Sequence, residues 1–209
     1  MKENNWFDPF YIQSHLNEEE SNIQKNVRDF CNNELKPTVV ERNRKNEFDQ
    51  SLYPKFGSLG VLGQTVKTHG GSGTSNLAYG LVAYEFEKID SSYRSSISVQ
   101  SSLVIHPINE FGSQEQKDKY LPQLIKGEKI GCFGLTESEA GSDPASMKTS
   151  FKKTKDGYIL NGSKNWITNA PIADIFIIWA IEENKDHKSI KGFIIEKNTE
   201  GLNLSLIHI

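Results

Sequence analysis

The sequence predicts an α+β protein in which a helical region is followed by a sheet-forming region. Up to about residue 128, apolar residues recur at the three- and four-residue spacing of amphipathic helices, and capping residues bracket these stretches. From residue 129 onward, apolar residues alternate or run in short blocks between turn-forming residues, as in strands. We therefore predict an N-terminal helical domain over residues 1–128 and a β domain over residues 129–209.

Helices are expected over residues 17–36, 49–59, 75–90, 95–111 and 114–126. The first should begin with a capping box formed by Asn17 and Glu20, and Pro37 should end it. Ser113 and Gln116 have the same spacing at the start of the last helix. These start and stop signals divide the first 128 residues into helices joined by short connections.

Strands are expected over residues 129–135, 146–153, 158–161, 172–181, 191–196 and 202–207. A turn at residues 155–157 and an Asn-Gly pair at residues 161–162 separate neighbouring strands. The longest apolar run, over residues 175–181, is far too short to span a bilayer. It predicts a buried strand.

Composition and charge exclude several classes of function. The chain has 209 residues, 36% of them apolar, and a formal net charge of −3, which gives no reason to expect binding to nucleic acid or to a membrane. Cys31 and Cys132 provide neither a disulfide framework nor metal-ligand spacing, so we expect no metal and a reducing compartment. The N-terminal residues lack the features of a secretory signal or a transit peptide. We expect a cytoplasmic protein if the source is bacterial, and a mitochondrial matrix protein if it is eukaryotic.

Two segments carry the strongest functional signal. Residues 131–143 (GCFGLTESEAGSD) and 161–169 (NGSKNWITN) combine glycines, hydroxyl side chains, an acid pair and Trp166. Glycines allow close backbone approach, hydroxyls donate and accept hydrogen bonds, and Trp offers a flat face. These properties suit a heteroaromatic ring system with a pyrophosphate. The alternative is a Gly/Ser-rich hairpin structure in which Trp166 belongs to the core.

The two segments resemble the flavin-binding signature of the acyl-CoA dehydrogenase family. Residues 93–107 (YRSSISVQSSLVIHP) and 120–134 (YLPQLIKGEKIGCFG) are similar to its glutaryl-CoA dehydrogenase branch. The resemblance extends from about Trp6 to Leu204 and implies a helical domain followed by a truncated middle β-barrel domain. It implies FAD as cofactor, an electron-transfer flavoprotein as partner and a homotetramer for the full-length enzyme. The family's C-terminal helical bundle has no counterpart in this sequence.

The resemblance also implies which residues contact FAD. Thr136 would bind the pyrimidine side of the isoalloxazine, Thr168 its N5 edge, and Trp166 would pack on the ring system. Ser142 would lie near phosphate and the acyl-CoA chain. The complete implied set is Phe133, Gly134, Leu135, Thr136, Glu137, Gly141, Ser142, Trp166, Ile167 and Thr168.

A guanidinium at Arg94 suits a carboxylate, which it can hold with two hydrogen bonds. By resemblance, Arg94 and Ser95 would hold the distal carboxylate of glutaryl-CoA, with Ser98 in support. Glu87 would belong to a hydrogen-bond and proton network beside them. The alternatives are that Arg94 pairs with Asp90 or Glu87 at the surface, and that Glu87 is a solvated helix carboxylate.

The reaction implied is the FAD-dependent oxidative decarboxylation of glutaryl-CoA to crotonyl-CoA and CO₂, a step of lysine and tryptophan degradation. The family's catalytic base is a Glu of the C-terminal bundle, so no residue here is predicted to be the base. We expect this chain alone to be inactive and to bind FAD weakly. The alternatives are an acyl-CoA dehydrogenase of another substrate class, a glutaryl-CoA dehydrogenase that does not decarboxylate, and a non-catalytic acyl-CoA or flavin-binding module.

Overall fold

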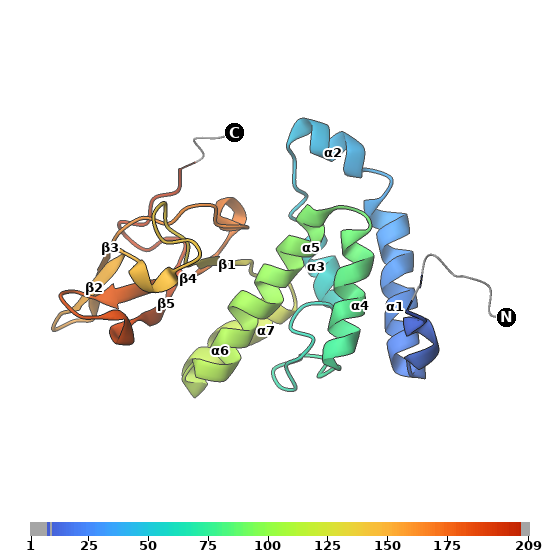
Figure 1. Ribbon diagram of the computed structural model, residues 1–209, viewed down its shortest axis with the longest axis horizontal. Helices are drawn as coiled ribbons and strands as arrows, with labels where there is room; N and C mark the ends of the chain where they lie inside the picture. Colours follow the sequence, from blue (N-terminus) through green and yellow to red (C-terminus); the bar gives the residue numbers. More distant parts are fainter. Residues whose placement is uncertain (1–7, 9, 206–209) are drawn as a thin grey trace.

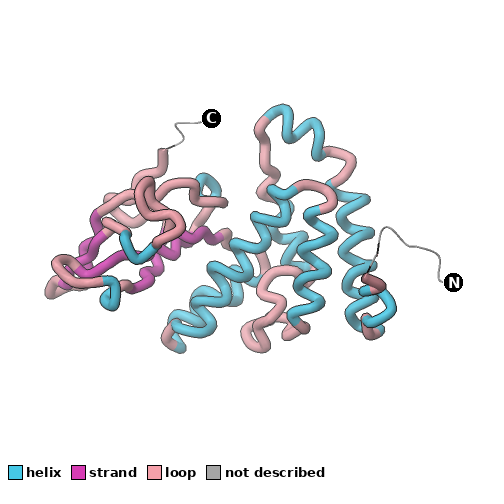
Figure 2. The backbone as a smooth tube through the Cα atoms, in the orientation of Figure 1, coloured by secondary structure: helices cyan, strands magenta, loops and turns pink. Residues whose placement is uncertain are grey.

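The computed structural model describes Asp8 and residues 10–205. Figure 1 shows a helical half and a sheet half side by side, with strand β1 leading from one to the other. In Figure 2 the strands gather in one half with loops and short helical turns, and the longer helices form the other half. The predicted α+β class, a helical N-terminal region followed by a sheet-containing region, is confirmed.

The helical half consists of segments that lie close to the predicted ones. They are α1 (Glu18–Phe30), the π-helix η2 (Cys31–Leu35), α2 (Val39–Lys45), α3 (Leu52–Ser58), α4 (Asn76–Glu87), α5 (Ser91–Ser98), the π-helix η3 (Val99–Ile105), α6 (His106–Phe111) and α7 (Gln114–Ile125). Both predicted capping boxes form, at Asn17 with Glu20 and at Ser113 with Gln116. Within the described ranges, no helix has the length and apolarity that a membrane crossing requires.

One helix was not predicted, and another begins four residues earlier than predicted. Helix α2 was not expected, and it has no apolar stripe to signal it because none of its residues is buried. The helix predicted from residue 95 begins at Ser91, since the Asp90 side chain accepts a hydrogen bond from the backbone N–H of Ser92 and caps it. As a result Arg94 lies inside α5, in its second turn.

The strands form one mixed sheet around β4 (Ile175–Glu182). Strand β1 (Gly131–Gly134) pairs in parallel with the first half of β4, from Gly131 opposite Ile175 onward. Strand β2 (Ser150–Lys153) pairs in parallel with the end of β4 and antiparallel with β3 (Tyr158–Asn161). Strand β5 (Lys191–Glu196) pairs antiparallel along the other edge of β4.

The prediction of a strand over residues 202–207 fails for its described part. Residues 202–205 have no strand pairing, and the remainder lies outside the described residues. Leu202 packs instead against a small apolar cluster. Its apolar character therefore reflects local packing and not a place in the sheet.

The central strand β4 is buried on both faces, as its apolar run predicted. Ile175 and Ile177 belong to the large core that fills the helical half, whereas Phe176 belongs to a small cluster with Cys132 and Ala173. Alternate residues of a strand point to opposite faces, which explains the division. Ile175 and Ile177 pack the sheet against the helical core. This contact positions the sheet, and with it the loops that follow β1 and β3.

Candidate functional site

The two glycine- and hydroxyl-containing segments lie side by side. The first leaves the carboxyl end of β1, and the second follows β3. The backbone N–H of Asn165 donates to the carbonyl of Thr136 at 2.9 Å, and Lys164 Nζ donates to the carbonyl of Leu135 at 2.9 Å. Two stretches that are about 30 residues apart in the sequence thus form one surface.

A buried ion pair joins the same two segments. Lys164 Nζ lies 2.7 Å from Glu137 Oε1, and their side chains are 7% and 9% exposed. The Glu137 carboxylate also accepts hydrogen bonds from the backbone N–H groups of Lys148, at 2.7 Å, and Thr149, at 3.0 Å. Burial alone would raise the pKa of Glu137, but the hydrogen bonds from Lys164, Thr149 and Lys148 lower this pKa to about 2. Glu137 is therefore ionised at neutral pH.

Several of the predicted ligand contacts lie open to solvent on this surface. The Trp166 side chain is 78% exposed, and Gly141, Ser142 and Thr168 are also exposed. A Cβ placed on Gly141 would meet nothing within 4 Å. Trp166 has a φ of 61°, a left-handed conformation that is rare for a non-glycine residue and often marks functional sites. The alternative in which Trp166 is a core residue is excluded.

Other predicted contacts point their side chains into the protein. Phe133 packs against the helical core and lies 5.9 Å, centroid to centroid, from the ring of Trp179. Ile167 packs against the small cluster around Phe176. A Cβ on Gly134 would lie 2.5 Å from Ile178. The side chains of Phe133, Ile167 and Glu137 are therefore packed within the protein and not directed at the open surface.

A polar chain ties the second segment to the helical half. Asn169 Nδ2 donates to the carbonyls of Ser96, at 3.3 Å, and Gly131, at 3.2 Å. Ser96 Oγ donates to Asn169 Oδ1 at 3.0 Å, and the Tyr53 hydroxyl lies 2.6 Å from Ser96 Oγ. Asn169 has a φ of 69°, so both its backbone and its side chain are specialised for this corner.

The start of β1 is fixed by a buried glutamine, Gln100, on η3. Its Nε2 donates to the carbonyls of Leu124 and Lys129, both at 2.9 Å, and its Oε1 accepts the N–H of Gly131 at 2.7 Å. Gly131 has no room for a side chain, because a Cβ would lie 2.5 Å from Val104. Strand β1 therefore enters the site from a rigid anchor on the helical half.

The predicted substrate residues lie around the turn between α4 and α5. Arg94 Nε donates to Glu87 Oε2 at 2.7 Å, and the two side chains are 38% and 45% exposed. Glu87 also accepts from Ser91 Oγ at 2.5 Å, and the hydrogen bonds from Ser91 and Arg94 lower the pKa of Glu87. Ser95 and Ser98 are partly buried in α5. The pairing with Glu87, one of the alternatives weighed above, is the one observed.

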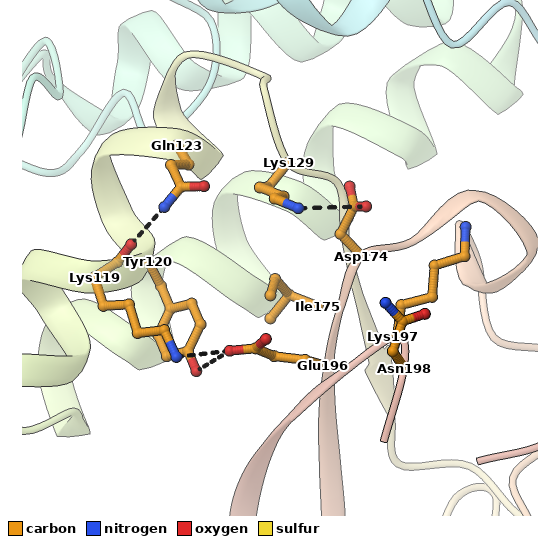
Figure 3. Close-up of a pocket in the computed structure, with 9 residues that line it drawn as sticks. All are labelled: Lys119, Tyr120, Gln123, Lys129, Asp174, Ile175, Glu196, Lys197 and Asn198. Carbon is orange, nitrogen blue, oxygen red and sulfur yellow. Dashed lines mark hydrogen bonds and ion pairs between the residues drawn. The ribbon is translucent and has the colours of Figure 1, made fainter. Parts of the chain in front are cut away.

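The cavity shown in Figure 3 lies away from the two segments. It measures about 180 Å³ and is lined by residues of α7, the start of β4 and the end of β5: Lys119, Tyr120, Gln123, Lys129, Asp174, Ile175, Glu196, Lys197 and Asn198. Lys129 precedes β1, whereas the predicted site follows it, so the two features are at opposite ends of the strand. Over the described residues, no group of three or more His, Cys, Asp or Glu side chains is placed to hold a metal.

Four residues of this region were not singled out from the sequence: Lys164, Asn169, Ser96 and Gln100. Lys164 and Asn169 stand inside the quoted second segment, but Glu137 and Ser96, their partners here, are 27 and 73 residues away and no local pattern reveals them. Ser96 and Gln100 sit on the 93–107 stretch, where their side chains face β1 and Asn169.

Comparison with known proteins matches both halves of the chain to one family. Residues 17–128 match the acyl-CoA dehydrogenase N-terminal domain, and residues 132–208 match the acyl-CoA dehydrogenase middle domain. The chain belongs to the acyl-CoA dehydrogenase family.

Individual relatives differ in the substrate that they are named for. A glutaryl-CoA dehydrogenase of Mycobacterium smegmatis, solved in complex with FADH2, superimposes with a TM-score of 0.88 at 41% identity, over 92% of this chain and 49% of that one. Butyryl-CoA dehydrogenase of Megasphaera elsdenii superimposes with a TM-score of 0.81 at 39% identity, over 89% of this chain and 50% of that one. An acyl-CoA dehydrogenase of Bacillus subtilis is 38% identical over 189 residues, which are 90% of this chain and 50% of that protein. The chain spans about half the length of the relatives it matches.

Proposed function

We propose that this chain is the part of an FAD-dependent acyl-CoA dehydrogenase that holds the flavin ring against the acyl chain. The observation that carries the proposal is the joining of residues 135–137 to residues 164–165 in one surface that exposes Trp166 and Thr168. A flat aromatic face beside hydroxyl and backbone donors is chemically suited to an isoalloxazine. When bound, FAD would supply the acceptor for the hydride that leaves the acyl β-carbon.

The residues present fit such a cofactor. Thr136 and Thr168 would donate hydrogen bonds to the ring, Trp166 would pack on its face, and Ser142 would lie toward the phosphate. Gly141 leaves open space where a phosphate oxygen could approach the backbone. Donors fixed by the Lys164–Glu137 pair and by Asn169 need little rearrangement on binding, which favours affinity.

We further propose glutaryl-CoA as the substrate, converted to crotonyl-CoA and CO₂ with an electron-transfer flavoprotein as the electron acceptor and a homotetramer as the working assembly. Arg94 would bind the distal carboxylate, with Ser95 and Ser98 in support. Glu87 bonds Nε of Arg94, so the terminal nitrogens of the guanidinium fork face away from that contact. A carboxylate on those nitrogens would sit beside Glu87 in one hydrogen-bond network centred on Arg94.

One observation favours a monocarboxylic acyl-CoA as a second candidate. The charge of Arg94 is already neutralised by Glu87 at 2.7 Å, so the pair together offers no net attraction to a second carboxylate. Under this reading the Arg94–Glu87 pair would be a surface feature of the α4–α5 turn. The butyryl-CoA relative is compatible with it.

Two titrations test these proposals. FAD added to the 209-residue chain should bind weakly but saturably and quench Trp fluorescence, and Trp166→Ala should weaken binding further. Saturable binding unaffected by Trp166→Ala, or no binding, would contradict the flavin site. Arg94→Gln should then weaken binding of glutaryl-CoA but not of butyryl-CoA, and equal losses for the two ligands would favour the second candidate.

A further inference from the structure

We propose that the Glu137–Lys164 ion pair is a positioning device for the ligand surface, and that Glu137 acts through this pair and not as a direct ligand contact. The inference rests on the proposed function, because the surface in question is the proposed flavin site. It assigns a role to Lys164, which the sequence pattern did not single out, and a different role to Glu137.

The first reason is that the pair connects every loop of the surface. Glu137 lies in the loop after β1, and its own N–H and carbonyl bond Ala140 at 3.1 and 3.3 Å, which folds that loop into a tight turn. Its carboxylate reaches the backbone N–H groups of Lys148 and Thr149 in the approach to β2. Lys164 brings in the loop after β3. One ion pair therefore fixes three chain segments that are distant in the sequence.

The second reason is that the carboxylate is enclosed and already bonded to donors of the protein. Three donors surround it: Lys164 Nζ at 2.7 Å, Lys148 N at 2.7 Å and Thr149 N at 3.0 Å. Its side chain is 9% exposed. A ligand that reached the carboxylate would have to open this enclosure, and a buried carboxylate that loses a partner is strongly disfavoured.

The third reason is that Lys164 also holds the backbone from which the ligand donors project. Its Nζ bonds the carbonyl of Leu135, the residue directly before Thr136, while the neighbouring Asn165 N–H bonds the carbonyl of Thr136. Both bonds use carbonyl oxygens, so the Thr136 hydroxyl takes part in neither of them. Trp166 follows two residues after Lys164. Loss of the pair would release both flanks of the surface at once.

The helical half offers a matched control. Glu85 is also a buried carboxylate, 2% exposed, and it bonds Gln24 Nε2 at 2.9 Å and Arg28 Nη2 at 2.8 Å. The bonds from Gln24 and Arg28 to Glu85 join α1 to α4, and both helices are distant in the sequence from the two ligand segments. Glu85→Gln should lower stability without changing the ligand surface, so it separates general destabilisation from positioning.

The test compares Lys164→Met, Lys164→Arg and Glu85→Gln in the full 209-residue chain, using FAD titration, the flavin absorption spectrum and backbone hydrogen exchange. Lys164→Met keeps the length of the side chain but removes its charge. We expect FAD affinity to fall by about tenfold or more, as when the support of a binding site is loosened. Exchange should rise in residues 135–149 and 163–166 while α1, α4 and α7 stay protected, and Lys164→Arg should restore much of both.

Several results would overturn the inference. Unchanged FAD affinity and an unchanged spectrum in Lys164→Met would do so, as would a loss of affinity in Glu85→Gln as large as that in Lys164→Met. If the wild-type chain does not bind FAD, the proposed function fails, and exchange then decides the inference alone. Local loss of protection in the two segments would support the positioning role, and uniform or absent loss would refute it.

Discussion

The two halves of the molecule differ in the size of the apolar core that each contains. The helical half surrounds a continuous apolar core that includes Phe56, Phe86 and Leu35, all fully buried. The sheet half has a second cluster of only three buried residues, Cys132, Ala173 and Phe176. The described part of the sheet half also contains the Glu137–Lys164 ion pair, which lies beside the candidate ligand surface.

This difference teaches how the site is built. A large apolar core is non-directional and tolerates small shifts, whereas charge-assisted hydrogen bonds have fixed geometry. Glu137–Lys164, Asn169–Ser96 and Gln100 each connect specific backbone atoms of the ligand loops or of β1. The helical half therefore provides most of the stability, and the polar contacts provide the shape of the surface. The following predictions test that division, from the largest expected effect to the smallest.

Phe56→Ala should cause the largest loss of stability. Phe56 is 0% exposed and its ring contacts those of Phe30, Tyr53 and Phe86 at centroid distances of 6.0, 5.8 and 5.4 Å. Removal of such a ring leaves a cavity and costs about 3–5 kcal/mol. Urea unfolding followed by circular dichroism measures this. A loss similar to that of an exposed control, Phe111→Ala (82% exposed), would contradict the account.

Gln100→Leu should lower the free energy of unfolding by about 3 kcal/mol. It leaves the carbonyls of Leu124 and Lys129 and the N–H of Gly131 without their partner, and so weakens the link between the helical half and β1. Hydrogen exchange should rise first in β1. Gln100→Glu is the companion variant: it keeps an acceptor for Gly131 but loses the two amide donor bonds. If Gln100→Leu matches wild-type stability, the anchor has no energetic role.

Acidification should weaken the sheet half before the helical half. The pKa of Glu137 is about 2 in the folded protein and 4.5 when unperturbed, so its stabilisation is fully present above pH 4.5 and is lost as pH falls toward 2. The amount is on the order of 2–3 kcal/mol. Denaturant unfolding at pH 7, 4 and 3 measures it, and Glu137→Gln should flatten the dependence. A wild-type slope in that variant would assign the effect to other carboxylates.

Asn169→Ala and Asn169→Gly should differ from each other by about 1 kcal/mol. Both lose the bonds to Ser96 and Gly131, but glycine accepts the φ of 69° without strain and alanine does not. Thermal unfolding of the two variants measures the backbone contribution alone. If the alanine and glycine variants have the same melting temperature, residue 169 does not keep its left-handed backbone conformation in solution.

Glu87→Gln should have the smallest effect on stability, because the Arg94–Glu87 pair is solvent-exposed and such pairs contribute little. Its expected effect is on ligand choice: with the neutralising charge removed, Arg94 should hold glutaryl-CoA more tightly, whereas butyryl-CoA binding should not change. A large fall in melting temperature would show that the pair is structural after all.

Much of this architecture could be predicted from the sequence because the signals are local. Capping boxes at Asn17 and Ser113 and the apolar run 175–181 depend on neighbours in the chain, and they predicted the helices and the central strand. Helix α2 was not predicted because none of its residues is fully buried, so it has no apolar stripe. The pairings of Lys164 with Glu137 and of Asn169 with Ser96 were not predicted, because each joins positions that only the fold brings together. The resemblance singled out the segments of the site, but not the contacts that shape it.

The most direct test of the central claim is hydrogen exchange of the 209-residue chain with and without saturating FAD, resolved by peptide. We expect added protection in residues 133–142 and 163–169, where the polar contacts shape the surface, and little change in α1 and α4, which lie outside both ligand segments. Protection confined to the helices, or none anywhere, would contradict the account.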